Sequence, residues 1–581
     1  MRRPLSLLAL VIGSTACDRT VPPPDRIFVN ARIWTGDATH PEATALALRG
    51  DTIVAVGTDD SLRTLAGPTT IVEDLGGRRM LPGFHDAHWH LPTRRTADLN
   101  GAEDVAELIA RLEAFAEELP ADAWITGRGW TPQRFPGRTP HRRYLDAAFP
   151  TRPVLLTDRD GHQVLANTVA LQRAGITKDT PVPVGGAIVL DRDGTPTGLL
   201  QETAMPLVRN QLPAPTADEV YAALRYEMHR AAERGLTALQ LAQGMSATED
   251  SAIARALVED SLLVRFRVGV PFSATVADST LERYAALVRA QTGPLIRYGL
   301  AKGMLDGTVD AGTAGMLEPY SAGRRDLGLL RWDVDTLRMT IARYDRAGLQ
   351  VALHAIGDRA IRIALDAYEQ VQREGGRRDA RHRIEHLEVP HPTDIPRFKA
   401  LGVIASTQAI FATPDATGLG NYLTMLGPDR ADRPMPFKSL DDAGAIQPFG
   451  SDYPVFPMNP LWGIYTAVTR QLDDGTPFGG WNPEQRITLE AALRHYTADA
   501  AYAAFREQEI GVLKVGMLAD FVVLSEEIFD VPSVVLMRAT PVLTVMGGRE
   551  TYRSTSLVSR TKSAPTTKVN VAMITGYQSP E

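Results

Sequence analysis

Short apolar runs alternate with amphipathic stretches along the middle of the chain. In Val334 to Ala347 and Arg359 to Gln372, apolar residues recur at spacings of three and four, which is typical of helices that bury one face. This alternation predicts βα units and a parallel sheet, and eight candidate strands favour an α/β fold of the (β/α)8 TIM-barrel type. The predicted strands are Met80 to Phe84, Leu236 to Gln240, Val264 to Val270, Tyr298 to Met304, Gln350 to His354, His382 to His386, Val403 to Gln408 and Ile446 to Ser451.

Both ends of the chain carry short apolar segments broken by glycines, a pattern that predicts strands and turns. We therefore expect a small β-sandwich domain formed from both termini, residues 26–79 and 506–553, beside a barrel domain of residues 80–505. The distance between the first two predicted barrel strands is too long for one βα unit, so residues of about 95–230 are expected to form an insertion over one barrel face. The terminal segments are Ile27 to Trp34, Ala45 to Val56, Leu518 to Leu524 and Val542 to Val545.

The first residues have the pattern of an export signal. Arg2 and Arg3 precede an apolar run from Leu5 to Ile12, which is followed by small residues and then Cys17. The run is far shorter than the roughly 20 residues that span a bilayer, so residues 1–17 are predicted to be a signal peptide. Cys17 is the only cysteine, and its place resembles the lipidation site of a bacterial lipoprotein; the alternative is a plain secretory signal with an incidental cysteine.

We accordingly expect an exported protein of the bacterial cell envelope or periplasm, anchored to a membrane only through an N-terminal lipid. Residues 18–25 contain three prolines and are predicted to be a stiff linker. Residues 554–581 are rich in Ser, Thr and Lys and have no apolar pattern, which predicts a disordered tail.

Size and charge narrow the function classes. A chain of 581 residues with 44% hydrophobic and 23% charged residues has the profile of a globular enzyme and is too long for a small binding module. The net charge of −7 argues against a nucleic-acid partner, whose phosphates attract basic surfaces. We therefore expect a small-molecule substrate.

Histidines and one aspartate follow the predicted strands. His88 and His90 are two residues apart, so in extended backbone both imidazoles point to the same side. His354 and His386 close two later strands, and Asp452 follows the last one. Because the carboxyl ends of barrel strands meet at one mouth, these groups are expected to form a divalent-metal site suited to zinc.

The fourth predicted strand brings Lys302 to the same mouth. A free ammonium has no lone pair for a metal, whereas carbamylation by CO2 would convert the amine into an anionic bridging carboxylate. The alternative is a partly buried lysine paired with Asp306.

These motifs resemble the amidohydrolase superfamily and, within it, the branch called amidohydrolase family 3, which includes N-substituted formamide deformylases. The resemblance covers roughly residues 26–552. Trp89 and His85 occupy positions where the family usually has aliphatic residues, which leaves the ligands intact but puts the substrate shape in doubt. The motifs are Pro82-Gly83-Phe84 to His88-Trp89-His90, Asp160-Gly161-His162 with Asn167, Lys302 with Asp306-Gly307, His354 to Asp358, Arg383 to His386, Gly450-Ser451-Asp452 with Pro454, and Ile510-Gly511 to Asp520.

The resemblance implies a binuclear centre, with two divalent ions and a carbamylated lysine. It also implies residues near a substrate pocket, and homodimers are common in similar proteins. The implied metal ligands are His88, His90, Lys302, His354, His386 and Asp452, and the implied pocket residues are Asn167, Tyr320 and Arg470.

The resulting hypothesis is a metal-dependent amidohydrolase that cleaves a C–N bond, of N-formyl or N-acyl type, by metal-activated hydroxide. Asp452 would act as general acid and base, and His162 would bind the substrate oxyanion or anchor a polar group. Three alternatives remain: an ester or lactone hydrolase, a mononuclear deaminase of cyclic substrates on the same fold, and a non-catalytic surface lipoprotein.

Overall fold

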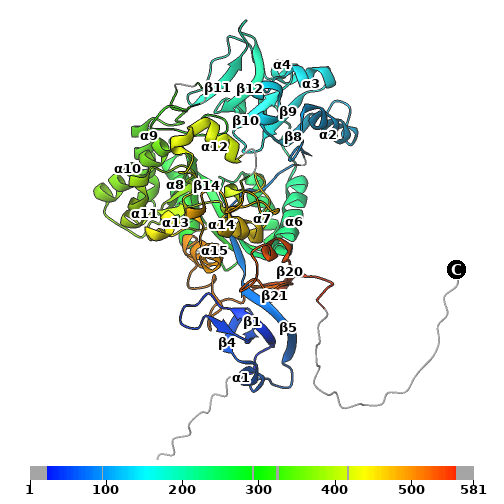
Figure 1. The fold of residues 1–581 in the computed structure, drawn as a ribbon, viewed down its shortest axis with the longest axis vertical. Coiled ribbons are helices and arrows are strands. Elements are labelled where there is room, and N and C mark those ends of the chain that lie inside the picture. The colour runs from blue at the N-terminus through cyan, green and yellow to red at the C-terminus, as the bar shows by residue number, and fades with distance from the viewer. Residues whose placement is uncertain are drawn as a thin grey trace, which may run out of the picture.

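The computed structural model describes residues 22–557, apart from residues 95, 291–292, 322, 324–325 and 415–417. The predicted signal peptide, Cys17 and nearly all of the predicted tail lie outside the described residues and stay predictions. Three parts follow one another along the longest axis of the molecule: a small sheet, a barrel and a second sheet domain (Figure 1). No helix among the described residues is long and apolar enough to cross a bilayer.

The central part is a parallel barrel, as the fold class predicted. Seven strands pair in the order β18-β17-β16-β15-β14-β13-β6. Strands such as β13 and β16 are buried along their whole length, because the strands of a parallel barrel have a packed interior on one side and helices on the other. The seven strands are β6 (Phe84–Trp89), β13 (Leu236–Leu241), β14 (Arg265–Pro271), β15 (Ile296–Met304), β16 (Gln350–Ala355), β17 (Arg383–His386) and β18 (Ile404–Ser406).

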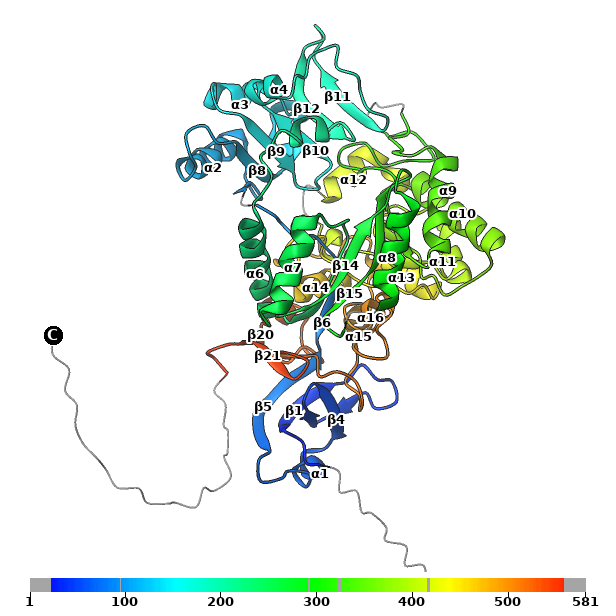
Figure 2. The same ribbon diagram turned by 180° about the vertical axis from the view of Figure 1, so that it is seen from behind.

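Amphipathic helices cover the outside of the barrel, and Figure 2 shows α6, α7 and α8 beside β14 and β15. In α10 the buried residues recur every three or four positions, for example Ile361, Ala364, Leu365 and Tyr368, which is the spacing of one helix face. The helices of this part are α6 (Ala217–Glu233), α7 (Ala247–Val258), α8 (Asp278–Ala290), α9 (Val334–Arg346), α10 (Asp358–Gly375), α11 (Ile395–Leu401), α12 (Gly418–Leu426), α13 (Phe437–Asp442), α14 (Pro460–Thr469), α15 (Leu489–His495) and α16 (Ala498–Ala503).

The first and last predicted barrel strands differ from the structure. β5 (Ile71–Pro82) belongs to the small sheet, and the chain enters the barrel only after Gly83, where a Cβ would lie 2.3 Å from Thr237 Oγ1. The predicted strand Ile446 to Ser451 forms only an isolated bridge, Thr407 with Phe449, and a second bridge joins Trp89 to Tyr453. These two bridges close the barrel between β18 and β6.

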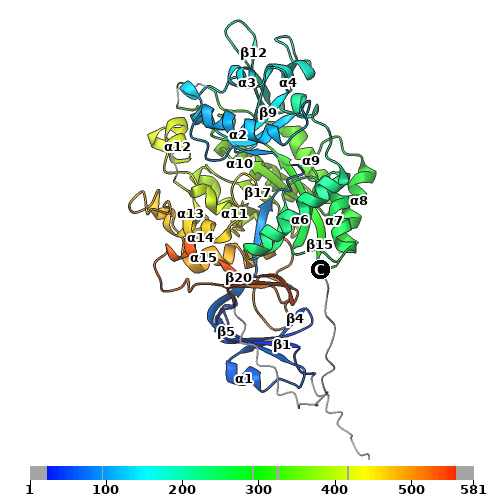
Figure 3. The ribbon, with the colours of Figure 1, turned by 90° about the vertical axis from the view of Figure 1, so that its right-hand side faces the viewer.

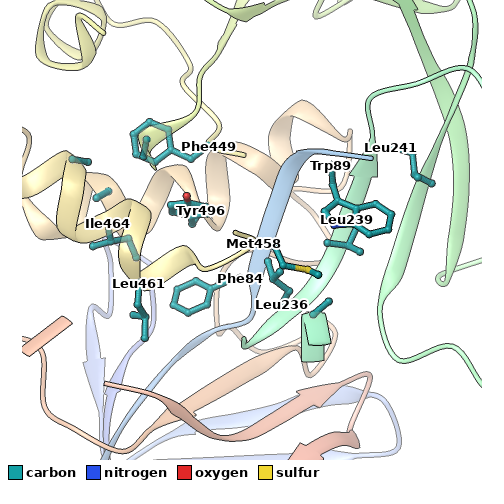
Figure 4. Close-up of a cluster of buried hydrophobic side chains, with 14 of the residues drawn as sticks. Phe84, Trp89, Leu236, Leu239, Leu241, Phe449, Met458, Leu461, Ile464 and Tyr496 are labelled. Atoms are coloured by element: carbon teal, nitrogen blue, oxygen red, sulfur yellow. The ribbon is translucent and has the colours of Figure 1, made fainter. Parts of the chain in front are cut away.

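The largest hydrophobic cluster joins β6 and β13 to the helices beside them. Phe84 and Leu236 lie near Leu461 of α14 and Tyr496, whose ring meets Phe84 edge to face at 6.4 Å (Figure 4). Each such side chain contributes about 1.5–3 kcal/mol on burial. The cluster therefore anchors the first strand, which carries His88 and is followed directly by His90.

Both chain ends build the small sheet, in which all strands are hydrogen-bonded into one layer. β5 pairs with the C-terminal strand β19 in antiparallel register, Met80 opposite Val523, and Phe28 packs edge to face on Phe521 at 5.1 Å. Its elements are β1 (Arg26–Trp34), β2 (Glu42–Ala43), β3 (Ala45–Arg49), β4 (Thr52–Gly57), α1 (Asp59–Arg63), β5, β19 (Phe521–Leu524), β20 (Pro541–Met546) and β21 (Arg549–Arg553), with α17 (Val535–Arg538) between β19 and β20.

The insertion after the first barrel strand forms a six-stranded sheet domain at the opposite end of the barrel from the small sheet (Figure 3). It is shorter than predicted, because α6, inside the predicted range of 95–230, packs on β13, β20 and β21. The domain contains β7 (Ala97–Asp98), α2 (Val105–Glu117), β8 (Ile125–Trp130), α3 (Arg143–Ala148), β9 (Val154–Asp158), β10 (Gln163–Ala166), α4 (Thr168–Arg173), β11 (Gly186–Leu190), β12 (Pro196–Glu202) and α5 (Pro206–Arg209).

Candidate metal centre and active site

The six predicted ligands converge at the carboxyl ends of the barrel strands. The imidazole rings of His88 and His386 lie 4.7 Å apart, and those of His386 and His354 lie 4.4 Å apart. Lys302 Nζ lies 3.5 Å from His88 Nε2. Residues hundreds of positions apart in the chain therefore share one small volume, as the barrel mouth predicts.

Three of these side chains are close enough to hold one ion. One ligand atom each from His88, His90 and Asp452 lies within 4.8 Å of the others. Asp452 Oδ1 is 2.9 Å from His90 Nε2 and 3.4 Å from His88 Nε2. Two imidazoles and a carboxylate are a donor set that suits zinc and neighbouring divalent metals.

The backbone around Asp452 is held against the first strand. Asp452 N–H donates to the His88 carbonyl at 2.7 Å, and both the N–H and hydroxyl of Ser451 donate to Asp86. A Cβ at Gly450 would lie 2.5 Å from His88 N, so only glycine permits this approach. Asp452 and His386 adopt the left-handed backbone region, at a cost of about 1–3 kcal/mol each.

Hydrogen bonds behind the histidines decide which ring nitrogen faces the centre. Nδ1 of His88 lies 2.6 Å from Glu385 Oε2, Nδ1 of His90 lies 3.1 Å from Gln243 Oε1, and Nδ1 of His386 lies 2.9 Å from Gln408 Oε1. Because each of these acceptors is bonded to Nδ1, it is Nε2 of the same histidine that faces the centre.

His354 is turned the other way. Its Nε2 donates to the Gly307 carbonyl at 3.1 Å, and its Nδ1 has no partner among the described residues. The centre is therefore bordered by four imidazoles, each with one nitrogen turned towards it, and those of His88 and His90 lie beside the Asp452 carboxylate. This donor set fits a metal site, because neutral imidazole nitrogens and a carboxylate oxygen converge on one point.

The protonation states also suit ligands. Burial lowers the pKa of His90, His354 and His386, which favours the neutral form that binds a metal. Burial alone would raise the pKa of Asp452, but the adjacent His88 and His90 hold it well below its usual range. Asp452 is consequently an anion at neutral pH.

Lys302 is buried, and burial lowers the pKa of its amine. The alternative pairing with Asp306 does not occur. Asp306 accepts backbone N–H groups of Gly315, Ile356 and Gly357 instead. The amine of Lys302 thus lies among imidazoles without a carboxylate partner within 4 Å in the described part of the chain.

A cleft with about 590 Å³ of atom-free space, open to solvent, adjoins the ligands. Of the predicted ligands, His354, His386 and Asp452 line it. His162, on the turn between β9 and β10 of the insertion, also lines it, and its ring centroid lies 4.8 Å from that of His354. The insertion therefore completes the mouth of the barrel.

Glu202, at the end of β12, orients His162 and was not predicted from the sequence. His162 Nδ1 lies 3.0 Å from Glu202 Oε2, and Glu202 is also bonded to Thr313 and Arg331. Burial would lower the pKa of His162, but Glu202 raises it overall, so the imidazolium is favoured and Nε2–H is a donor. A long-range pair of this kind leaves no signal in sequence spacing.

The three residues predicted for the substrate pocket lie outside the cleft. Asn167 is the N-cap of α4, and its side chain bonds the backbone of Val154, Phe149 and Arg152. The Tyr320 hydroxyl donates to the Ala314 carbonyl at 2.8 Å. The Arg470 guanidinium donates to the Met435 carbonyl and packs over Trp481. Their contacts in this structure are with the protein itself.

Glu385 and Asp358 lie near predicted ligands in the sequence, but of these two only Glu385 orients a histidine. Asp358 accepts the backbone N–H of Leu317 at 2.7 Å, away from His354. Gln243 and Gln408, which the sequence analysis did not single out, orient His90 and His386.

The fold and this cluster define a class: a (β/α)8-barrel protein with a metal-binding donor set at the mouth of its strands. The amidohydrolase family matches residues 71–552, and the chain belongs to this family of metal-dependent hydrolases.

Similar proteins cover nearly the whole chain. Protein LONG AFTER FAR-RED 3 of Arabidopsis thaliana is 32% identical over 547 residues, which is 91% of either chain. The N-substituted formamide deformylase of Arthrobacter pascens is 28% identical and covers 87% of this chain and 94% of its own. An uncharacterized metal-dependent hydrolase from Pyrococcus horikoshii has a similar structure, with a TM-score of 0.68 at 23% identity over 87% of this chain and 99% of its own.

Proposed function

We propose that the protein hydrolyses an amide-type C–N bond, of N-formyl or N-acyl type, with two divalent metal ions, zinc being the natural choice. The observation that carries the proposal is the position of Asp452, whose carboxylate contacts two imidazoles and also lines the cleft. The similarity to an N-substituted formamide deformylase supports the choice of bond.

His88, His90, His354, His386 and Asp452 would hold the ions, together with a carbamylated Lys302. In that modification the neutral amine of Lys302 attacks the carbon of CO2: the C–N bond forms as one C=O π bond opens to give the negatively charged carboxylate oxygen, and one amine proton leaves to solvent. Bound divalent ions would lower the pKa of a water from about 15.7 towards about 7 and polarise the substrate carbonyl.

The protein's own groups would move the protons. Asp452 accepts a proton from the attacking water as the new C–O bond forms, because its carboxylate is ionised and faces the cleft. The same carboxyl then donates that proton to the amine nitrogen as the C–N bond breaks. His162, held by Glu202 as an imidazolium, donates Nε2–H to the substrate oxygen while negative charge develops there.

Elemental analysis of the purified protein combined with a substrate screen tests the proposal. We expect two metal ions per chain and hydrolysis of N-formyl, N-acyl or N-acylamino-acid compounds. Turnover of the matching esters or lactones alone would contradict the assigned bond. One metal per chain with an active Lys302→Ala variant would instead support a mononuclear deaminase.

A rescue experiment tests the modified lysine directly. Lys302→Ala should lose metal and activity, and a short carboxylate such as acetate should restore part of both by replacing the carbamate. Lys178→Ala is the matched control, because the side chain of Lys178 is 66% exposed. This variant should keep its metal and its activity, and acetate should change neither. Full activity of Lys302→Ala without acetate would contradict the ligand role.

A further inference from the structure

The cleft beside the metal ligands is rich in carboxyl groups. Besides Asp452, its lining includes the carboxylates of Asp160, Asp310 and Glu388, and a single guanidinium, Arg159. Arg159 Nε lies 3.3 Å from Asp160 Oδ1, so these two charges offset each other. Within the described residues neither Asp310 nor Glu388 has a cation within 4 Å.

The fold does not satisfy these two carboxylates. Glu388 is 6% exposed, and its Oε2 accepts the Tyr422 hydroxyl at 2.5 Å, while its Oε1 has no partner in the described part of the chain. Asp310 Oδ1 accepts Gln133 Nε2 at 2.9 Å, and its second oxygen is left without a described partner. Both side chains line the cleft, so each has one carboxylate oxygen that no described protein group occupies and that a bound molecule can contact.

The electrostatics of Asp310 agree with this geometry. Burial and the nearby Asp160 raise the pKa of Asp310 to about 6, although Arg159 and Arg138 act in the opposite direction. A cation bound next to Asp310 would favour its ionised form.

Aromatic rings line the same cleft as the carboxylates, and one of them, Phe456, already packs against the Arg159 guanidinium. Phe411 and Phe456 have ring centroids 4.9 Å apart, and both line the cleft together with Tyr422. The face of an aromatic ring attracts organic cations, and carboxylates next to such rings form the usual surroundings of a bound ammonium group. The same lining includes Asp452 and His162, so one molecule can reach both the ammonium-binding groups and the reacting centre.

We propose that the cleft selects amides that carry a second, protonated amino group, which Asp310 and Glu388 bind as an ammonium. The simplest such substrate is an N-acylated aliphatic diamine. This inference rests on the proposed amide hydrolysis and adds the substrate class to it.

Three acetamides that differ only in the remote end group test the proposal on the zinc-loaded protein. They are N-acetyl-1,4-diaminobutane, N-(4-hydroxybutyl)acetamide and 4-acetamidobutanoate, which are cationic, neutral and anionic. We expect kcat/KM for the cation to exceed that for the neutral compound by about tenfold or more. A preference for the neutral or the anionic compound would overturn the proposal.

Conservative variants locate the preference. Asp310→Asn and Glu388→Gln should each lower the cation-to-neutral ratio of kcat/KM by about tenfold. The ratio cancels any general loss of activity, and Asp335→Asn, on the exposed first turn of α9, is the matched control. An unchanged ratio in both variants would overturn the assignment.

A binding measurement separates this inference from the proposed function. Calorimetric titration of the zinc-loaded protein with 1,4-diaminobutane needs no turnover, and 1,4-butanediol is its neutral counterpart. Binding of the diamine that weakens about tenfold in Asp310→Asn supports the ammonium site even if no amide is cleaved, in which case only the hydrolysis proposal fails. Amide cleavage by a protein that binds the diamine no better than the diol leaves hydrolysis standing and overturns the ammonium site.

Discussion

Two groups of histidines in the barrel, all buried except the half-buried His90, differ in what their ring nitrogens contact. At the mouth, His88, His90, His354 and His386 each have one nitrogen that faces the centre and one that is bonded behind it. His382, away from the mouth, has both nitrogens taken: its Nδ1 accepts Val351 N–H and its Nε2 lies 3.0 Å from Asp345. Burial alone therefore does not mark a candidate ligand, whereas convergence of several ring nitrogens on one point does.

His495 shows the structural case most clearly. Its Nδ1 lies 2.6 Å from Asp499 and its Nε2 lies 3.2 Å from Asp441. Burial would lower the pKa of His495, but these two carboxylates raise it, so the imidazolium is the favoured form. At the mouth, burial instead lowers the pKa of His90, His354 and His386, which favours the neutral form that binds a metal.

The largest expected effect on activity comes from replacing a carboxylate at the mouth, compared with one beside the structural histidine His495. Asp452→Asn should lower kcat by roughly 10³-fold, because the variant loses both a metal ligand and the proton acceptor. Asp441→Asn, beside His495, should keep kcat and lower the melting temperature. Steady-state kinetics measures kcat and thermal denaturation measures the melting temperature of both variants. An active Asp452→Asn enzyme would contradict the mechanism.

A structural histidine should affect stability without affecting the metal. His495→Ala leaves Asp499 and Asp441 without their buried partner, so the free energy of unfolding should fall by about 3 kcal/mol. His354→Ala should instead lose bound metal. Urea denaturation and elemental analysis of both variants check the contrast, which fails if His495→Ala loses its metal while His354→Ala retains it.

The residues behind the ligands should have a smaller effect than the ligands. Glu385→Gln keeps the shape of the side chain but removes the charge that orients His88, so metal affinity should fall by about 10- to 100-fold. Competition with a chelator measures this change. Glu282→Gln on the exposed face of α8 is the control, and equal affinities of the two variants would argue against the orienting role.

The smallest effect is a pH dependence of stability. Because the folded state raises the pKa of His495, its stabilising contribution is complete below the unfolded pKa near 6.5 and is lost as pH rises through the folded pKa. The difference in unfolding free energy between the wild type and His495→Gln should therefore shrink from pH 6 to pH 9. Denaturation curves of both proteins at pH 6 and pH 9 measure this difference. A difference in unfolding free energy that grows with pH would contradict the prediction.

Local pattern was sufficient for much of this architecture. The helical spacing of α10, the buried strands β13 and β16 and the order of the ligands along the chain all follow from residue types and periodicity. The first barrel strand was misplaced, because Met80 and Leu81 are as apolar as Phe84 and only the pairing of β5 with β19 assigns them to the small sheet.

Pocket residues were harder to predict than ligands. His88 and His90 can be recognised in the sequence because they are two residues apart. Glu202, Gln243 and Gln408 instead contact histidines that are 40, 153 and 22 residues away in the chain. Asn167 was misjudged for the related reason that a polar side chain next to a motif can equally cap a helix.

The sequence by itself determined the periodicities and the barrel class and predicted a set of candidate metal-binding side chains, because these depend on residue type and on spacing within one element. Only the tertiary structure decided which nitrogen of each histidine is free, how the insertion brings His162 to the mouth, and which carboxylates of the cleft lack a cation. Those properties depend on contacts between segments that are distant along the chain, and burial in a folded interior gives such contacts their energy.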